Sequence, residues 1–479
     1  VDSEFTTKQW IVLALVLIAL TGVLLTAPAR LRNSVMSTAG IVIAVGAVIA
    51  VIVNNLESVN FLYHQRGGLT VAWAVIVAII SAAGAWYVRS EAVIENRASF
   101  RRLSDADRSR EISTIILLTG LAVIVIPMIT GKITQELMAN VGIFLLLALG
   151  LNIVVGLAGI LDLGYVAFFA VGGYTTAVLT SENRGEDWPS WVPILDFPWG
   201  WVLALLVTIV VAALVGLMIG APVIRMRGDY LAIVTLGFGE IIRLLFLSDW
   251  LSGFFNGAQG ITNIPPADFG PFQATGVDPR SIFYLVLVFA VISIYVSWRL
   301  ERSRLGRAWM AVREDESVAE AMGINTVTVK LMAFVVGAVL ASFSGAIFAA
   351  KVGSIFPTSF LILVSIIILV VVIVGGMGNI VGVIVGAVVL IGVLGGPKQP
   401  GLLQEFSQYK LLIYGALLIW MMLQRPEGLV PNARRSRELH QEEFLQDAWL
   451  KGEVDHDDGT PGDGVIVDDS DGGTEVAPA

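Results

Sequence analysis

Long apolar segments recur along almost the whole chain, and each approaches the length needed to cross a bilayer. A membrane-spanning helix needs about 20 mostly apolar residues. Thirteen segments approach this requirement: 9–26, 35–53, 69–87, 112–130, 137–155, 164–179, 199–221, 230–247, 281–296, 331–350, 360–374, 380–394 and 411–423. The composition agrees, since only 14% of the 479 residues are charged, against about 25% in a typical soluble domain. The sequence therefore predicts a polytopic membrane protein and argues against a soluble enzyme, a nucleic-acid binder or a disordered scaffold.

The distribution of positive charge predicts how these segments are oriented. If the amino terminus lies outside and the spans alternate, 21 of the 30 Lys and Arg residues fall in inside connections, and Arg243 falls within a span. The remaining eight, on the outside, are Lys8, Arg66, Lys132, Arg184, Arg280, Lys351, Lys398 and Lys410. Cytoplasmic loops are enriched in Lys and Arg. We therefore predict a multi-pass protein of the cell membrane with its amino terminus outside and its carboxyl terminus in the cytoplasm.

Three parts of the chain differ in composition. Residues 1–110 contain three apolar segments and end in an arginine-rich linker, and residues 111–430 form a glycine-rich main membrane domain. Residues 431–479 form a cytoplasmic segment whose tail, 452–479, has nine acidic residues and no Lys or Arg, a composition typical of disorder. Two glycine-broken stretches lie in the two halves of the main domain, as in transporters with interrupted helices. The predicted fold is all-α: a transmembrane helical bundle with discontinuous, glycine-broken helices.

An acidic residue interrupts the first glycine-broken stretch. Asp162 lies in the apolar run 151–165, where an unpaired carboxylate costs about 2.5–3.5 kcal/mol. The flanking glycines permit a helix break whose freed backbone groups line a water-filled path. Two interpretations stay open: Asp162 caps the helix that follows, or Asp162, with the nearby Tyr165, belongs to a translocation pathway.

A second charged site lies inside an apolar segment. Glu240 and Arg243 are three residues apart within 230–247, so they share a helix face and can form an ion pair. Ionisable residues inside a membrane span are retained for structure or for a path. The pair is therefore either a buried bridge between helices or a group that contacts or gates the substrate.

The loop 304–325 combines charge with apolar residues at helical spacing. Trp309, Val312, Glu316, Ala319 and Gly323 recur every three or four residues, and glycine suits a helix carboxyl terminus. Such a helix either inserts into a groove on a cytosolic partner or is a solvated loop helix with positive-inside arginines. The pattern alone leaves both interpretations open.

Several catalytic signatures are absent from the sequence. It contains no G-x-x-x-x-G-K-[ST] phosphate loop, no H-E-x-x-H and no G-x-S-x-G. It has no cysteine and only three scattered histidines, which makes a thiolate or histidine metal site improbable. We predict no catalytic residue, no metal and no cofactor, so any energy for transport comes from another subunit or from an ion gradient.

Together these stretches resemble the branched-chain amino acid (leucine/isoleucine/valine) ABC-importer permease family, and in particular its M-type membrane subunit. The matching stretches are 149–174, 228–243, 255–261, 303–325, 374–379 and 425–429. The resemblance implies three kinds of partner besides membrane lipid: a homologous second permease, two cytosolic ATPase subunits and an extracytoplasmic substrate-binding protein. It also implies a cytoplasmic coupling helix that contacts the ATPase, formed by Arg313, Glu314, Glu320, Ala321 and Gly323. Here Met322 stands where the family motif has Ala.

Other functions are compatible with parts of the sequence. Sister permeases that import urea or short amides share these motifs. A secondary transporter could use Asp162 and Glu240 to carry protons, although the loop helix and the arginine beside Glu240 argue against it. A membrane enzyme would need a nucleophile and base, and no such set is recognisable. Neighbouring genes for ATPases and a binding protein would distinguish the first class from the others.

Overall fold

The computed structural model describes residues 120, 123–128, 130–223, 226, 229–270, 272–396, 409–424 and 428–430. They all lie in the first of the chain's two compact units, Val1–Pro431. The predicted spans 9–26, 35–53 and 69–87, most of 112–130, the arginine-rich linker and the acidic tail lie outside the described residues.

The described part is mostly helical and contains six helices that are long and apolar enough to cross a membrane. They are α6 with the π-helical turn η1 (Lys132–Leu151 and Asn152–Leu157), α8 (Gly200–Val223), α9 (Asp229–Leu247), α11 (Pro279–Glu301), α14 (Thr326–Val352) and α15 with η4 (Ile362–Gly375 and Pro357–Ser359). Three shorter apolar helices are α7 (Val166–Thr180), α16 (Ile380–Leu394) and α17 (Lys410–Gln424). These helices coincide with the apolar segments predicted between residues 137 and 423, so a protein with multiple candidate membrane spans is confirmed. The shorter helices include both glycine-broken stretches.

Short elements fill the connections between these helices. They are η2 (Asp249–Leu251), α10 (Ser252–Phe255), η3 (Gly257–Gln259), the strands β1 (Ala267–Asp268) and β2 (Gln273–Ala274), α12 (Arg304–Glu314) and α13 (Glu316–Ala321). The strands are a small departure from the predicted all-α fold. They pair antiparallel, with Ala267 opposite Ala274. The chain reverses at Gly270, where φ is +79°, and the Gly270 N–H donates to Asp268 Oδ1 at 2.7 Å.

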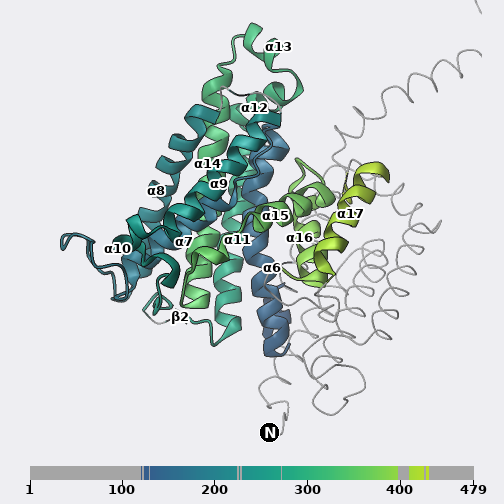
Figure 1. Ribbon diagram of the computed structural model, residues 1–479. Helices are drawn as coiled ribbons and strands as arrows, with labels where there is room; N and C mark the ends of the chain where they lie inside the picture. Colours follow the sequence, from purple (N-terminus) through teal and green to yellow (C-terminus); the bar gives the residue numbers. More distant parts are fainter. Residues whose placement is uncertain are drawn as a thin grey trace, which may run out of the picture. The chain divides into compact units, whose positions relative to one another are not determined.

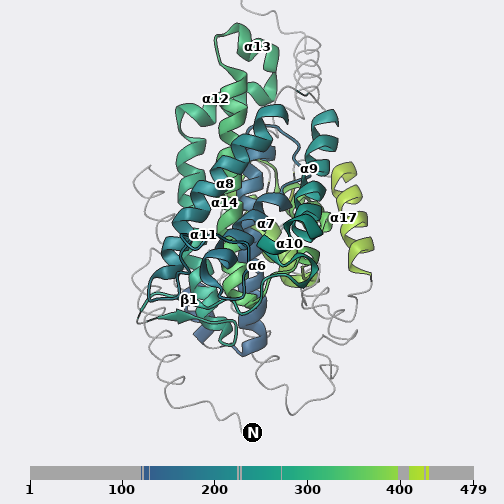
Figure 2. The same ribbon diagram turned by 60° about the vertical axis from the view of Figure 1, so that its left-hand side comes forward.

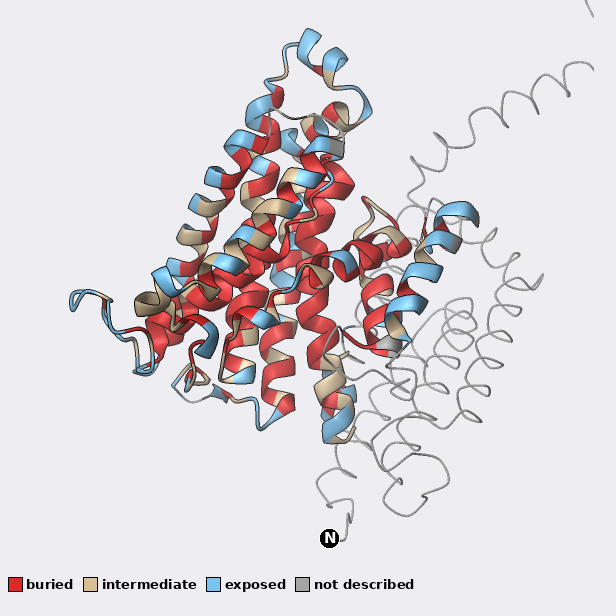
Figure 3. Ribbon diagram, viewed as in Figure 1, coloured by how far each residue is buried: buried red, intermediate tan, exposed pale blue. Residues whose placement is uncertain are grey.

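Helix α14 lies against α6, α7 and α8 in the most buried part of the bundle (Figure 3). The backbones of α7 and α14 approach so closely that a Cβ added at Gly172 would lie 2.5 Å from the Cα of Ser342. Close approach through small residues is the usual way for helices to pack in a membrane, where apolar side chains gain nothing from leaving water. Glycine in α7 therefore brings the first helix break close to the long helix α14.

The connections gather at two opposite ends of the described bundle. Helices α12 and α13 lie at one end, and the β-strands lie toward the other, in both views (Figures 1 and 2). We refer to them as the α13 end and the hairpin end. The burial of the spans differs: 83% of the most apolar window of α6 is buried, against 28% in α9. One face of α9 is therefore open to whatever surrounds this chain.

The close approach of Gly164, just before α7, to α9 gives a stability prediction. A Cβ at Gly164 would lie 1.9 Å from the carbonyl oxygen of Thr235, whereas a Cβ at Gly237 meets no atom within 4 Å. Overpacking typically costs about 1–3 kcal/mol, and backbone atoms yield less readily than side chains. We expect Gly164→Ala to lower the midpoint of thermal unfolding in detergent and the yield of monodisperse protein. Gly237→Ala, on the same helix as Thr235, is the control. Equal stability of the two variants would contradict the close packing of Gly164 against the Thr235 carbonyl.

Candidate translocation and coupling sites

The first helix break follows a change in helical geometry. Helix α6 passes at Asn152 into the π-helical turn η1, which ends at Leu157, and α7 begins only at Val166. Single π-turns inside helices are frequent at functional sites. The first N–H of α7, that of Val166, donates to Ser365 Oγ of α15 at 2.8 Å. A residue 199 positions away thus satisfies a backbone donor that the break leaves open.

Asp162 lies inside this break and is only 2% exposed. Its Oδ1 accepts the N–H of Gly164 at 2.9 Å, which forms a local turn before the helix. The neighbouring N–H, that of Leu163, donates to Thr235 Oγ1 of α9 at 3.1 Å. The capping interpretation is wrong, because the chain does not become helical until Tyr165, and Tyr165 is the N-cap of α7. Asp162 instead forms a turn in the non-helical segment, whose Leu163 N–H contacts α9.

Tyr165 is fully buried beside α14. Its hydroxyl donates to the carbonyl oxygen of Gly337 at 2.8 Å, and its ring packs edge-on against Phe168. A Cβ at Gly150 of α6 would lie 2.0 Å from this hydroxyl. Tyr165 therefore connects the break to both α6 and α14.

The second glycine-broken stretch lies directly against the first. Between α15 and α16 the chain takes positive φ at Gly376 (+122°) and Gly378 (+78°), which favours glycine. The N–H of Gly378 donates to Asn152 Oδ1 at 2.8 Å. A Cβ at Gly156 would lie 2.5 Å from the same nitrogen. The sequence predicts both stretches, but their contact and the part played by Asn152 depend on residues 226 positions apart and leave no local pattern.

Glu240 and Arg243 pair on α9 as the spacing predicts. Arg243 Nε donates to Glu240 Oε1 at 2.9 Å, and Nη2 contacts the same oxygen. The Glu240 side chain is 38% exposed and lies on the helix stripe of Ile233 and Leu244, which are 65% and 48% exposed. Thr235, which faces Asp162, is about 140° away around the helix. The segment that contains Asp162 therefore contacts one face of α9, and the ion pair lies on another face of the same helix.

The loop 304–325 forms two helices where the spacing predicts one. The chain is extended at Asp315 (φ −154°, ψ 113°), which ends α12 and caps α13 by accepting the N–H groups of Ser317 and Val318. Asp competes with the helix for backbone donors in this way. These hydrogen bonds, led by the one from the Ser317 hydroxyl, lower the pKa of Asp315.

Both helices are fastened to the start of α14. Trp309 is fully buried, and its Nε1 donates to the carbonyl oxygen of Val329 at 2.7 Å. Glu316 and Lys330 form an ion pair at 2.6 Å. The predicted apolar positions Trp309 and Ala319 do face inward, so the spacing identifies the packed face although it misses the break at Asp315.

The predicted coupling residues do not form one surface. Glu314, Glu320, Ala321 and Gly323 are exposed. Gly323 has φ +85°, and the N–H of Ile324 donates to the carbonyl of Ala319 at 3.0 Å, which is the glycine-terminated helix end that the sequence predicts. Arg313 instead points into the protein, where Nη1 donates to the carbonyl oxygen of Gly156 at 2.6 Å.

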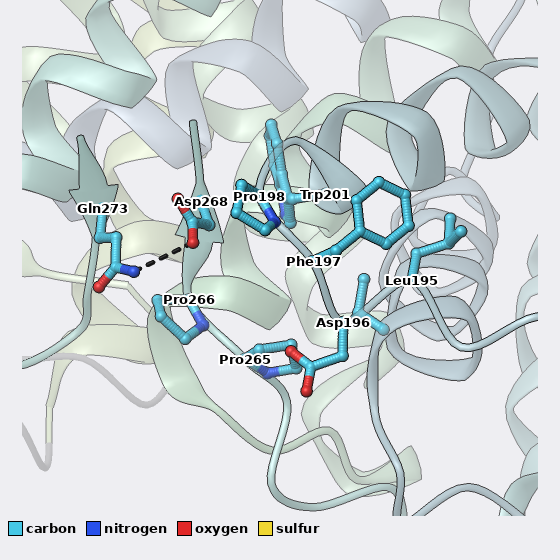
Figure 4. A pocket seen from close by; sticks show the side chains of 10 residues that line it. Leu195, Asp196, Phe197, Pro198, Trp201, Pro265, Pro266, Asp268 and Gln273 are labelled. Atoms are coloured by element: carbon cyan, nitrogen blue, oxygen red, sulfur yellow. Dashed lines mark hydrogen bonds between the residues drawn. The ribbon is translucent and has the colours of Figure 1, made fainter. Parts of the chain in front are cut away.

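A small cavity of about 190 Å³ opens at the hairpin end. Its lining residues are Thr180, Leu195, Asp196, Phe197, Pro198, Trp201, Pro265, Pro266, Asp268 and Gln273. Figure 4 shows the hydrogen bond from Gln273 Nε2 to Asp268 Oδ2, 3.0 Å long, on one side of it. Ligand pockets usually measure about 300–1,000 Å³, so this cavity is too small for a drug-sized ligand and does not connect the two ends of the bundle.

The arrangement of broken spans and an intramembrane ion pair is typical of a membrane transport subunit. Residues 133–422 match the family described as the permease component of branched-chain amino acid transport systems. The chain belongs to this family and is a permease component of an ABC transport system.

Individual relatives agree with this assignment. The high-affinity branched-chain amino acid transport system permease protein LivM of Salmonella typhimurium is 38% identical over 67% of this chain and 75% of its own length. LivM of Escherichia coli K12 is 39% identical over 64% and 72%, and LivH of the same strain is 24% identical over 60% and 91%. The chain is thus similar to both kinds of Liv permease, which suggests a paired permease. No solved structure matches it.

Proposed function

We propose that this chain, paired with a second homologous permease, imports branched-chain amino acids with energy from ATP hydrolysed by two cytosolic ATPase subunits. An extracytoplasmic binding protein delivers the substrate at the hairpin end. The observation that carries the proposal is the exposed helix α13 on a family member whose spans are broken by glycine. Both names among the relatives, LivM and LivH, refer to branched-chain amino acid transport, which supports that substrate class.

The α13 end faces the cytoplasm in this proposal. Five arginines of the described chain lie on α12 or the adjoining end of α11: Arg299, Arg302, Arg304, Arg307 and Arg313. Cytoplasmic loops carry an excess of such residues. The carboxyl end of the main domain reaches the same end, because the N–H of Leu429 donates to the carbonyl of Val374 at 2.7 Å, close to the second break.

The open face of α9 lies against the second permease or lines the path between the two subunits. Glu240 is the eleventh residue of the 18-residue span Tyr230–Leu247, so it lies near the bilayer centre. A charged pair there is costly against lipid and is normally turned toward a protein interior or water. We therefore assign Glu240 and Arg243 to the subunit interface or pathway, and Asp162 to the support of α9 behind it.

The ATPase subunit binds α13. Val318 and Met322 are 57% and 78% exposed and lie four residues apart, so they share a face. A short helix presenting apolar residues at this spacing fits a hydrophobic groove. Glu320, Ala321 and Gly323 lie beside them and belong to the same contact, together with Glu314 at the end of α12.

Reconstitution tests the function directly. We expect proteoliposomes containing both permeases and the ATPases to transport labelled leucine under two conditions. Mg-ATP must be present on the side of the membrane that carries the ATPases, and the loaded binding protein must be present on the opposite side. Uptake should survive collapse of the proton gradient, and excess unlabelled isoleucine, but not urea, should compete. Leucine uptake by this chain alone under a proton gradient, or competition by urea, would contradict the proposal.

A further inference from the structure

One arginine of the coupling region reaches both helix breaks. Arg313 lies near the end of α12, and its Nη1 donates to the carbonyl oxygen of Gly156 in η1 at 2.6 Å. The second break adjoins the same group, since a Cβ at Gly378 would lie 3.3 Å from Arg313 Nη1 and 3.1 Å from the Gly156 oxygen. A guanidinium is planar and carries several donors in a fixed fork, which suits a site between two backbone segments.

Glycines make room for this side chain. A Cβ at Gly159, where φ is +71°, would lie 2.4 Å from Arg313 Cγ. Gly378 also has positive φ, at +78°. The glycines of both broken stretches thus pack around the Arg313 side chain or its hydrogen bond, and a larger residue at Gly159 would displace it.

Other side-chain contacts of α12 and α13 lead to α14. Trp309 and Glu316 fasten α12 and α13 to α14, through Val329 and Lys330. Neither of these contacts touches η1 or the 375–379 turn. The hydrogen bond from Arg313 to Gly156 connects the α12–α13 pair directly to the broken segments.

We propose that Arg313 is a positioning residue that transmits movement of α12 and α13 to both helix breaks, so that ATP hydrolysis in the partner subunit moves the two broken spans together. This role rests on the proposed contact of α13 with the ATPase. It differs from the coupling-surface role predicted for Arg313, because the guanidinium binds this chain's own backbone. The guanidinium is charged, so its hydrogen bond to the Gly156 carbonyl is stronger than one between neutral groups.

The test compares Arg313→Gln with Arg307→Gln in the complete transporter. Arg307 lies on the same helix but is exposed, with a 3.3 Å hydrogen bond to the carbonyl of Arg302 beside it. The readouts are co-purification of the ATPase, ATP hydrolysis stimulated by the loaded binding protein, and leucine imported per ATP hydrolysed. We expect Arg313→Gln to retain the ATPase and to lower leucine per ATP about tenfold. Arg307→Gln should match the wild type.

Two further variants separate transmission from simple structural support. Arg313→Lys keeps the charge and can still donate a hydrogen bond, so it should recover part of the leucine-to-ATP ratio. Gly159→Ala keeps the arginine but should lower that ratio, because the added Cβ displaces the Arg313 side chain. Unchanged leucine per ATP in Arg313→Gln would overturn the inference. Loss of ATPase binding in that variant would also overturn it, because Arg313 would then be a docking residue. Failure of the wild-type complex to couple transport to ATP would instead contradict the proposed function.

Discussion

Replacing Val318 and Met322 together by glutamate is expected to abolish leucine uptake while leaving the chain inserted and folded. Both side chains are exposed on α13, and neither contributes to the buried face formed by Ala319. Truncating a hot-spot residue near the centre of an interface costs about 2 kcal/mol or more, which is about 30-fold in affinity. A glutamate at each position adds the desolvation of a charge in an apolar groove.

The measurement is co-purification of the ATPase with a tagged permease, followed by uptake normalised to the amount of inserted protein. Val277→Glu is the control, because Val277 is 87% exposed and lies between β2 and α11 at the opposite end. It should retain the ATPase fully. Normal ATPase binding by the Val318→Glu, Met322→Glu double variant would contradict the role of α13 as the docking helix. It would also contradict the proposal that the α13 end faces the cytoplasm.

The membrane helices are the part of the fold that the sequence predicts best. Hydropathy locates α6, α8, α9, α11, α14 and α15, because a span must be apolar along its whole length to enter lipid. The same composition cannot tell a full span from a shorter helix, and α7 begins only at Val166, where a long-range contact satisfies its first N–H group. The hydroxyl of Ser365 makes this contact.

In the candidate sites, too, some features follow from local sequence spacing and others depend on contacts between distant residues. The ion pair on α9 and the glycine end of α13 follow from spacing within four residues, which fixes helix faces and caps. The break at Asp315 and the turn at Asp162 are also local, because each carboxylate accepts backbone N–H groups within three residues. The direction of Arg313 is not local, because it depends on which backbone groups lie nearby in space, as when Gly156 and Gly378 meet around Asn152. A single sequence contains no signal for those pairings.

A double-mutant cycle on Glu240 and Arg243 is expected to show strong coupling between the two side chains. Glu240→Gln leaves Arg243 as an uncompensated charge near the bilayer centre, and Arg243→Gln does the same to Glu240. Removing one partner of a buried pair costs about 3–5 kcal/mol, whereas replacing both is often nearly neutral. Each single variant should therefore lose most uptake or inserted protein, and the double Gln variant should recover part of the loss.

Uptake per inserted molecule distinguishes the roles open to this pair. Leu244→Gln is the control, because it adds a neutral amide to the same stripe of α9 without breaking an ion pair. If the open face lies against the second permease, the single variants should also lose that subunit on purification, since an unpaired charge would have to be buried in the interface. If the face lines the path, the subunit stays bound and uptake alone falls. Strictly additive losses from Glu240→Gln and Arg243→Gln would mean that the ion pair contributes to neither role, and each side chain would then act through a separate contact.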